Sequence, residues 1–101
     1  MSDSAVLMDA AGELRLSGVL DYRTGPGLRE QGQALIKASK AATVVVDCSA
    51  VTKSSSVGLS LLLCFMRDAQ AAGKALSIRG MPEDMREIAE VSELTELLAN
   101  P

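Results

Sequence analysis

The sequence contains no histidine and no tryptophan, and its only aromatic residues are Tyr22 and Phe65. Without histidine the chain lacks the commonest general base and the commonest metal ligand, which argues against zinc sites and serine–histidine catalysis. With so few aromatic rings, little is available to stack on nucleic-acid bases. We therefore expect an aliphatic core, no metal and no cofactor.

Positive charge is also scarce. The ten Lys and Arg residues are scattered among thirteen Asp and Glu residues, and the formal net charge is −3 at pH 7. A protein that binds a phosphate backbone or an anionic lipid surface usually gathers its basic residues into a patch. Nucleic acid is therefore not an expected partner.

Long hydrophobic runs are absent as well. The longest, VGLSLLLCFM, is about half the length needed to span a bilayer, and the N-terminus lacks the basic segment of a secretory leader. The two cysteines, Cys48 and Cys64, lack CxxC spacing and are expected to be reduced, half-buried side chains. We expect a cytoplasmic protein without direct membrane insertion.

The length and the hydrophobic pattern indicate one compact α/β domain over residues 1–101. The predicted elements are strands 5–8 and 13–17, a helix capped by Thr24 that runs to residue 38, a strand 43–47, a helix 56–72 that ends at Gly73, a strand 75–79, a helix after Pro82 and a short helix from Ser92. The segment CSAVTKSSS after the central strand is interpreted as a polar connection. The order ββαβαβαα implies a mixed sheet of about four strands that opens with an antiparallel hairpin and continues in parallel.

The helix 56–72 has an unusual surface. Its predicted core face consists of Leu59, Leu62, Leu63, Met66 and Ala69. The opposite side consists of Ser56, Val57, Ser60, Cys64, Arg67, Asp68 and Ala71, with Leu61 at the border. A solvated helix normally carries more charge there. Two interpretations remain open: the helix is buried on this side too, for example under the last short helix, or the side is a docking surface for another protein.

The serine run before this helix also has two interpretations. Ser54 or Ser55 can cap the helix, and capping and turn chemistry account for serines at such a position. Ser56, just inside the first turn, is placed where a phosphoryl group would add negative charge to an exposed surface. Ser56 is therefore a candidate phosphorylation site.

The run VVVDCSAVTKSSSVGLSLLL resembles the centre of STAS domains, in which a strand ends in Asp and a loop leads to an Asp-Ser-Ser-Gly-like motif and an apolar helix. Asp47 matches the strand-end Asp, whose expected role is to order the following loop through backbone N–H groups. The four motif positions fall on Ser55, Ser56, Val57 and Gly58, so Ser56 stands at the regulatory position. The motif is incomplete, because Ser55 replaces its Asp and Val57 its second Ser. LRLSGVLDYRT and MPEDMREIAEVSELTELL extend the resemblance over most of the chain.

Among STAS proteins, this chain is most similar to the short subunits of phospholipid ABC transporters that maintain outer-membrane lipid asymmetry. That resemblance implies a non-enzymatic protein, held at the inner membrane by binding the transporter's ATPase subunit within a complex with the membrane permease. The expected interface consists of Lys53, Ser54, Ser55, Ser56, Gly58, Ser60, Leu61, Cys64 and Arg67, with Arg29 at its rim. The alternative is an anti-sigma factor antagonist switched by phosphorylation of Ser56. A small enzyme or nucleotide-binding domain is disfavoured, because no glycine-rich phosphate loop follows a strand.

Overall fold

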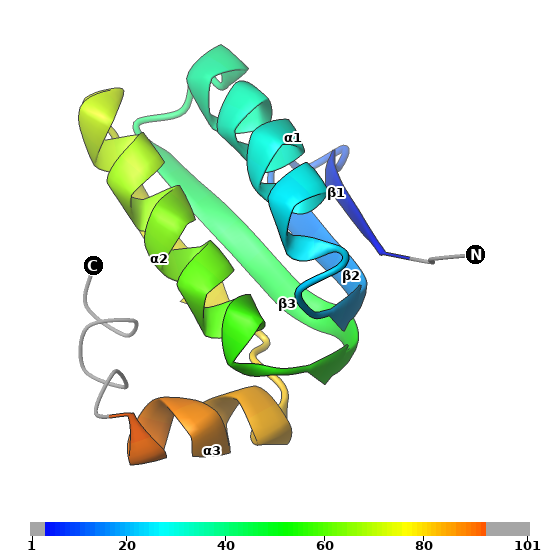
Figure 1. Cartoon of the computed structure of the whole chain (residues 1–101). Coiled ribbons are helices and arrows are strands. Elements are labelled where there is room, and N and C mark those ends of the chain that lie inside the picture. The colour runs from blue at the N-terminus through cyan, green and yellow to red at the C-terminus, as the bar shows by residue number, and fades with distance from the viewer. Residues whose placement is uncertain (1–3, 93–101) are drawn as a thin grey trace.

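The computed structural model describes residues 4–92, in which four strands and three helices form one layered α/β structure. In chain order these are β1 (Ala5–Met8), β2 (Leu14–Leu20), α1 (Gly25–Ala38), β3 (Thr43–Ser54), α2 (Ser56–Ala71), β4 (Ala75–Arg79) and α3 (Glu83–Val91) (Figure 1). The predicted order is confirmed as far as α3. Ser92, where a further short helix is predicted to begin, is the C-cap of α3. The rest of that predicted helix falls on residues 93–101, outside the described residues.

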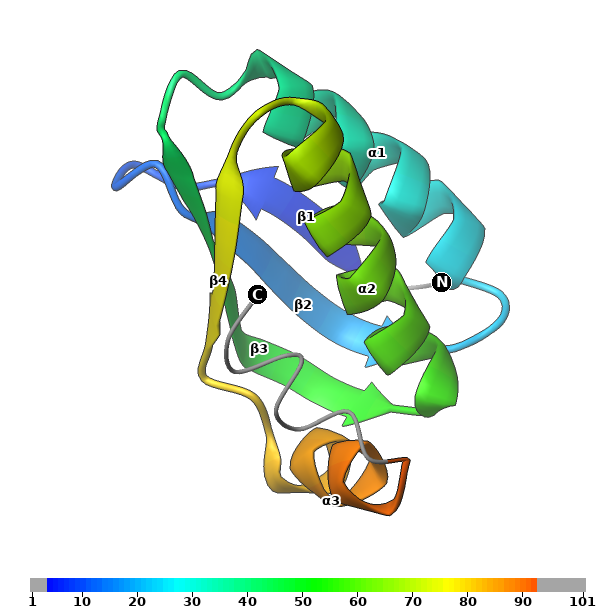
Figure 2. The ribbon, with the colours of Figure 1, turned by 90° about the vertical axis from the view of Figure 1, so that its left-hand side faces the viewer.

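The four strands form one mixed sheet in the order β1-β2-β3-β4 (Figure 2). β1 and β2 pair antiparallel, whereas β3 is parallel to both β2 and β4. The hairpin turn is held by Asp9, whose Oδ1 accepts the backbone N–H groups of Ala11 and Glu13, both at 2.9 Å. Each parallel pair is connected through a helix, as the alternation of strand and helix in the sequence predicts.

The central strand β3 is much longer than predicted, because residues 48–54 continue the strand and are not a connection. Its pairing with β2 shifts by one residue between Asp47 and Ala50 and again between Val51 and Lys53. Each shift marks a β-bulge, which inserts one extra residue on β3 and disturbs its period-two alternation. The inward side chains are Val44, Val46, Cys48, Val51 and Ser54. The bulges keep one face of β3 inward despite the polar residues between.

Helices α1 and α2 lie side by side on one face of the sheet (Figures 1 and 2). They approach closely where Gly32 of α1 meets the fully buried ring of Phe65 of α2. A Cβ added at Gly32 would lie 2.3 Å from Cε1 and 2.4 Å from Cζ of Phe65. Only glycine therefore allows the two helices to pack at this distance.

The buried side of α2 is wider than the periodicity indicated. Four of the five predicted core residues are buried, namely Leu59, Leu62, Met66 and Ala69. Leu63 is half-buried, and Phe65 belongs to the core although it was assigned to neither face. Leu61 and Asp68, expected near or on the outer side, are only 4% and 7% exposed. The reason is that α1 covers this side of α2. The periodicity of one helix does not show which of its sides a second helix covers.

Two helix-end predictions have different outcomes. Gly73, with φ of +73°, ends α2 as predicted. Thr24 does not cap α1 through its side chain. Its hydroxyl instead accepts the Asp21 N–H at 3.0 Å and donates to the Val19 carbonyl at 2.9 Å. The threonine therefore closes the turn that leads from β2 into α1.

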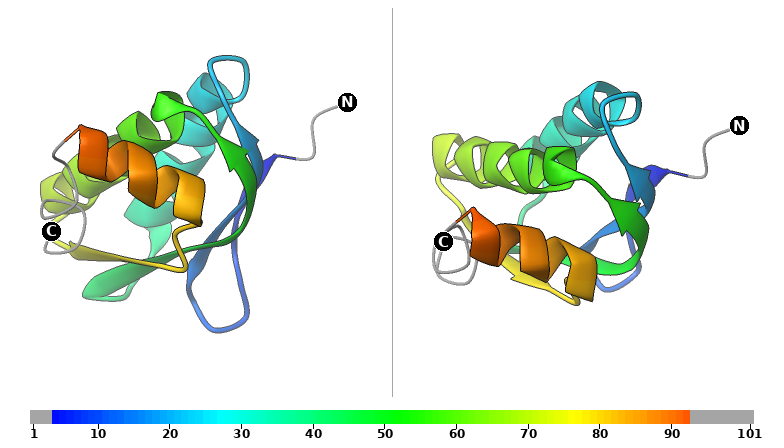
Figure 3. Two further views of the ribbon diagram at one scale, coloured as in Figure 1. Left: turned by 90° about the horizontal axis from the view of Figure 1, so that it is seen from below. Right: turned by 60° about the horizontal axis from the view of Figure 1, so that its bottom comes forward.

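Helix α3 lies at the end of the molecule where β3 ends and α2 begins, in contact with both (Figure 3). Its first turn contains Glu83 and Asp84, which favour the positive end of the helix dipole. Met85 and Ala89 are buried, as the sequence predicted, and Ile88 packs at the border of the core. This helix supports the segment from which α2 starts.

Candidate functional site

The three serines between β3 and α2 have three different environments. Ser54 is buried, and its hydroxyl donates to the Ser55 carbonyl at 2.8 Å. Ser55 caps α2: its Oγ accepts the Val57 N–H at 3.2 Å, and its own N–H donates to the Leu20 carbonyl at 3.0 Å. Ser56 is exposed, and within residues 4–92 its hydroxyl makes no hydrogen bond. Ser56 is therefore the serine of this run that is free to meet a partner or a modifying enzyme.

Gly58 fixes the first turn of α2 against the sheet. A Cβ at this position would lie 2.0 Å from Ser54 Oγ and 3.2 Å from Leu20 Cδ1. The backbone N–H of Ser54 donates in turn to Asp84 Oδ2 of α3 at 3.3 Å. Ser54 and Gly58, both expected at the interface, are thus buried residues that hold the exposed Ser56 in place.

The exposed side of α2 carries Ser56, Ser60 and Arg67, which lie on one side of the helix one to three turns apart. We call this set the α2 strip. Lys53, near the end of β3, is exposed as well. The exposure of these four residues agrees with the surface expected from the sequence.

A groove separates the N-terminal halves of α1 and α2. Its cavity volume is about 400 Å³, and its walls are predominantly apolar. The lining residues are Tyr22, Gly25, Pro26, Arg29, Val57, Ser60, Leu61 and Cys64. We call this cavity the α1–α2 groove. It brings together four residues of the expected interface, since Arg29, Ser60, Leu61 and Cys64 all contribute to its wall.

Arg29 connects the groove to a buried carboxylate on α2. Its Nη2 lies 3.5 Å from Asp68 Oδ1, and Gln33 Nε2 donates to the same oxygen at 3.3 Å. The other oxygen of Asp68, Oδ2, is buried without a hydrogen-bond partner among the described residues. Leaving such an oxygen unpaired costs free energy, so the pairing between α1 and α2 is incomplete at this point.

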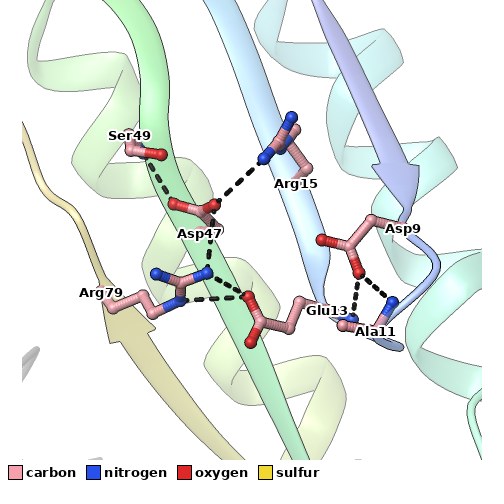
Figure 4. A network of polar contacts seen from close by, with 7 residues as sticks. All are labelled: Asp9, Ala11, Glu13, Arg15, Asp47, Ser49 and Arg79. Atoms are coloured by element: carbon pink, nitrogen blue, oxygen red, sulfur yellow. Dashed lines mark hydrogen bonds and ion pairs between the residues drawn. The ribbon is translucent and has the colours of Figure 1, made fainter.

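A second polar cluster surrounds Asp47 in the middle of β3 (Figure 4). Asp47 is 1% exposed; its Oδ1 accepts the Ser49 N–H at 2.9 Å, and its Oδ2 lies 3.4 Å from Arg79 and 3.8 Å from Arg15. The hydrogen bonds from Ser49, followed by the charges of the two arginines, hold the pKa of Asp47 below its ordinary value. The expectation of a strand-end Asp that orders a loop is wrong in its location, because the accepted N–H belongs to a bulge within β3.

Gly80, directly after β4, closes over this cluster. Its φ is +69°, and an added Cβ would lie 3.0 Å from both Asp47 Oδ1 and the Ser49 backbone nitrogen. We expect Gly80→Ala to lower the free energy of unfolding by about 1 to 2 kcal/mol. Alanine is strained at a positive φ, and its methyl group would also lie too close to Asp47 and Ser49. Urea denaturation measures the change.

The matched control for Gly80→Ala is Gly27→Ala. Gly27 is an exposed glycine within α1, and nothing lies within 4 Å of a Cβ added there. Alanine is expected to raise stability slightly at that helical position. Equal effects of the two substitutions would contradict the contact assigned to Gly80.

Residues 4–92 contain neither a metal-binding cluster nor a helix that could cross a membrane. Residues 4–92 contain no group of three or more Cys, Asp or Glu side chains that could hold a metal ion. Across the same residues, no helix has both the length and the apolar character required to cross a bilayer. Both cysteines are free, with Cys48 buried and Cys64 half-buried in the groove wall.

Four groove residues were not predicted as part of the site: Tyr22, Gly25, Pro26 and Val57. Tyr22 is 75% exposed, which is unusual for a large aromatic side chain. Gly25 allows the close approach of the helices, because a Cβ there would lie 2.8 Å from Val57 Cγ1. The sequence signal that could have indicated this part of the site is Tyr22, one of only two aromatic residues, just before the Gly25-Pro26 start of a helix.

Comparison with known proteins identifies one family and one fold for this chain. Residues 5–99 match the family described as Mlab, STAS domain. A chain of the Acinetobacter MlaFEDB complex in its ATP-bound Vtrans2 conformation is similar with a TM-score of 0.81 and 23% identity, covering 96% of this chain and 99% of that one. An anti-sigma factor antagonist from Mycobacterium paratuberculosis has a TM-score of 0.71 and 22% identity, covering 97% and 83%. The anti-sigma factor antagonist SpoIIAA in its unphosphorylated form has a TM-score of 0.70 and 20% identity, covering 92% and 83%.

Proposed function

Because the chain belongs to the family of MlaB-type STAS domains, we propose that it is the non-enzymatic STAS subunit of a phospholipid ABC transporter. In this role it binds the cytoplasmic, MlaF-like ATPase subunit and supports its assembly with the membrane permease. The complex moves phospholipid and so maintains outer-membrane asymmetry. As a single domain over residues 1–101, the protein is cytoplasmic and stays at the inner membrane through its partner.

The observation that carries this proposal is the exposed, nearly uncharged start of α2. Ser56 and Ser60 are exposed at the start of α2. This start is fixed because Gly58 packs against Ser54 and Asp84 accepts the Ser54 N–H. A rigid surface of small residues permits close approach by another protein. The similarity in fold to a chain of the MlaFEDB complex supports an ATPase as that protein.

Ser56→Asp tests the proposal. An aspartate at the start of α2 favours the helix dipole, so the fold is expected to be retained or slightly stabilised. At the interface the same carboxylate would lose its water without gaining a partner. We expect the affinity for the purified ATPase subunit to fall at least about tenfold, which corresponds to about 1.4 kcal/mol. Biolayer interferometry measures the affinity.

Two variants control this experiment. Ser56→Ala keeps the surface small and neutral, and binding is expected to stay close to that of the wild type. Ser77→Asp places the same charge on an exposed serine of β4. If Ser56→Asp binds as well as Ser77→Asp does, Ser56 does not belong to the interface.

A second candidate function is that of an anti-sigma factor antagonist, because two of the structures with this fold belong to that class and Ser56 is exposed at the motif position. In that case a partner kinase phosphorylates Ser56, and the unmodified protein sequesters the kinase. Against this, the Asp that opens the motif is Ser55 here, although Ser55 still caps α2. Mass spectrometry of the protein purified from its host separates the two: stoichiometric phosphate on Ser56 favours the antagonist, and recovery of an ABC ATPase favours the transporter subunit.

A further inference from the structure

The α1–α2 groove is an apolar cavity with one charged side chain in its wall, that of Arg29. Val57, Leu61 and Pro26 are apolar residues of its wall, and the exposed Tyr22 lines it as well. Bulky apolar anchors that fill such pockets supply most of the binding energy at protein interfaces. The cavity of about 400 Å³ is large enough to take one.

The groove is continuous with the α2 strip, because Ser60 belongs to both. A partner that covers Ser56 and Ser60 therefore also reaches the mouth of the groove. Since a standard interface takes about 800 Å² from each protein, the strip alone would be a small contact. Strip and groove together form a more adequate docking surface.

Three arginines lie at or near the groove in a protein that is acidic as a whole. Arg23 lies against the Tyr22 ring at 5.6 Å, Arg29 is in the wall, and Arg67 is on the α2 strip. The nearby carboxylates are Asp21, which accepts the backbone N–H groups of Arg23 and Thr24, Glu30, next to Arg29 on α1, and the buried Asp68, which pairs with Arg29.

Arg29 is available to a partner despite its contact with Asp68. Its side chain is 44% exposed and lies 3.5 Å from Asp68, whose Oδ1 is also bound by Gln33. A guanidinium has five N–H donors, so most of those on Arg29 remain free for a second carboxylate.

Building on the proposed function, we propose that the α1–α2 groove receives a bulky apolar side chain of the ATPase subunit, and that a carboxylate beside that side chain pairs with Arg29. The ATPase surface that docks here is thus an apolar anchor with an acidic neighbour. Ser56 then lies at the edge of the contact, and the groove lies at its centre.

Cys64 provides a direct readout, because it lines the groove. The chain has two cysteines; burial of the Cys48 thiol, assisted by the charge of Asp47, raises its pKa to about 12, which leaves Cys64 as the reactive one. In the purified complex with the ATPase subunit, we expect alkylation of Cys64 by N-ethylmaleimide to slow at least about tenfold relative to the free protein. Peptide mass spectrometry quantifies the modification.

Two substitutions test the groove and the charge separately. Ser60→Trp fills the mouth of the groove, and Arg29→Glu reverses its charge; each is expected to weaken ATPase binding at least about tenfold. Ser77→Trp, on the exposed face of β4, is the matched control and is expected to bind normally. Circular dichroism and the urea midpoint establish that each variant is folded. If Ser60→Trp does not fold, Arg29→Glu still tests the proposal.

The outcomes separate the two proposals. If the wild type does not bind the ATPase, the proposed function fails and the groove assignment fails with it. If the wild type binds but Cys64 stays reactive and both variants bind normally, the groove assignment alone is overturned. A dimer of this chain that Ser60→Trp dissociates, or an apolar small molecule that native mass spectrometry finds in the groove, would also overturn the assigned occupant.

Discussion

Phe65→Ala is expected to lower the free energy of unfolding by about 3 to 5 kcal/mol, the usual cost of removing a large aromatic side chain from a core. The ring is fully buried and fills the space between α1 and α2. Because it occupies the notch left by Gly32, its loss removes contacts from both helices at once. Urea denaturation followed by circular dichroism measures the change.

The contact between Gly32 and Phe65 can be isolated by a double-mutant cycle. Gly32→Ala alone is expected to cost about 1 to 3 kcal/mol, since its methyl group overlaps Cε1 and Cζ of the ring. In a Phe65→Leu background these two atoms are gone, so Gly32→Ala should cost clearly less there. Additive costs in the double mutant would contradict the packing described between the helices.

Asp47→Ala is the second substitution with a large expected effect. It leaves the Ser49 N–H without the Asp47 carboxylate that accepts it and removes the common partner of Arg15 and Arg79. We expect the free energy of unfolding at pH 7 to fall by about 2 to 3 kcal/mol. Ser49 remains in the bulge, so chemical shifts of residues near the bulge report whether the strand keeps its register.

The pH dependence distinguishes the charge of Asp47 from its size. The pKa of this carboxyl is lower in the folded protein than its unfolded value of about 3.9. The stabilisation from the carboxylate is therefore complete above that pH and is lost as the pH falls through the folded pKa. The difference in unfolding free energy between wild type and Asp47→Asn should be largest near pH 7 and shrink below about pH 4. A difference that stays constant over this range would contradict the electrostatic role.

Local patterns predicted much of this fold. The β1–β2 hairpin, a serine cap by Ser54 or Ser55 and the Gly73 end of α2 depend on neighbouring residues; the hairpin and the Gly73 end were predicted correctly, and of the two serines Ser55 is the cap. The extent of β3 was not, because its two bulges interrupt the alternation that identifies a strand. Ser, Thr and Lys in the bulged segment resemble a loop when the partner strand is unknown.

The candidate site shows the same division. The exposure of Ser56 and Ser60 follows from the period of one helix, and the sequence predicted it. The burial of Leu61 and Asp68 depends on α1, which no pattern within α2 contains. The groove likewise lies between the two helices, which meet closely where Gly25 faces Val57 and Gly32 faces Phe65.

The strand connections have a consequence for the kinetics of folding. β1 and β2 are joined by a tight turn, whereas β3 reaches β2 only after α1 has crossed the sheet, and β4 reaches β3 only after α2 has done so. Bringing together two strands that are separated by a whole helix costs chain entropy, and this cost arises before the hydrogen bonds and contacts between the strands offset it. The hairpin is thus expected to form early and the central strand to align late. Until β3 is aligned, the apolar inward face of β2 remains open to other chains, so rapid recruitment by a partner would also limit aggregation during synthesis.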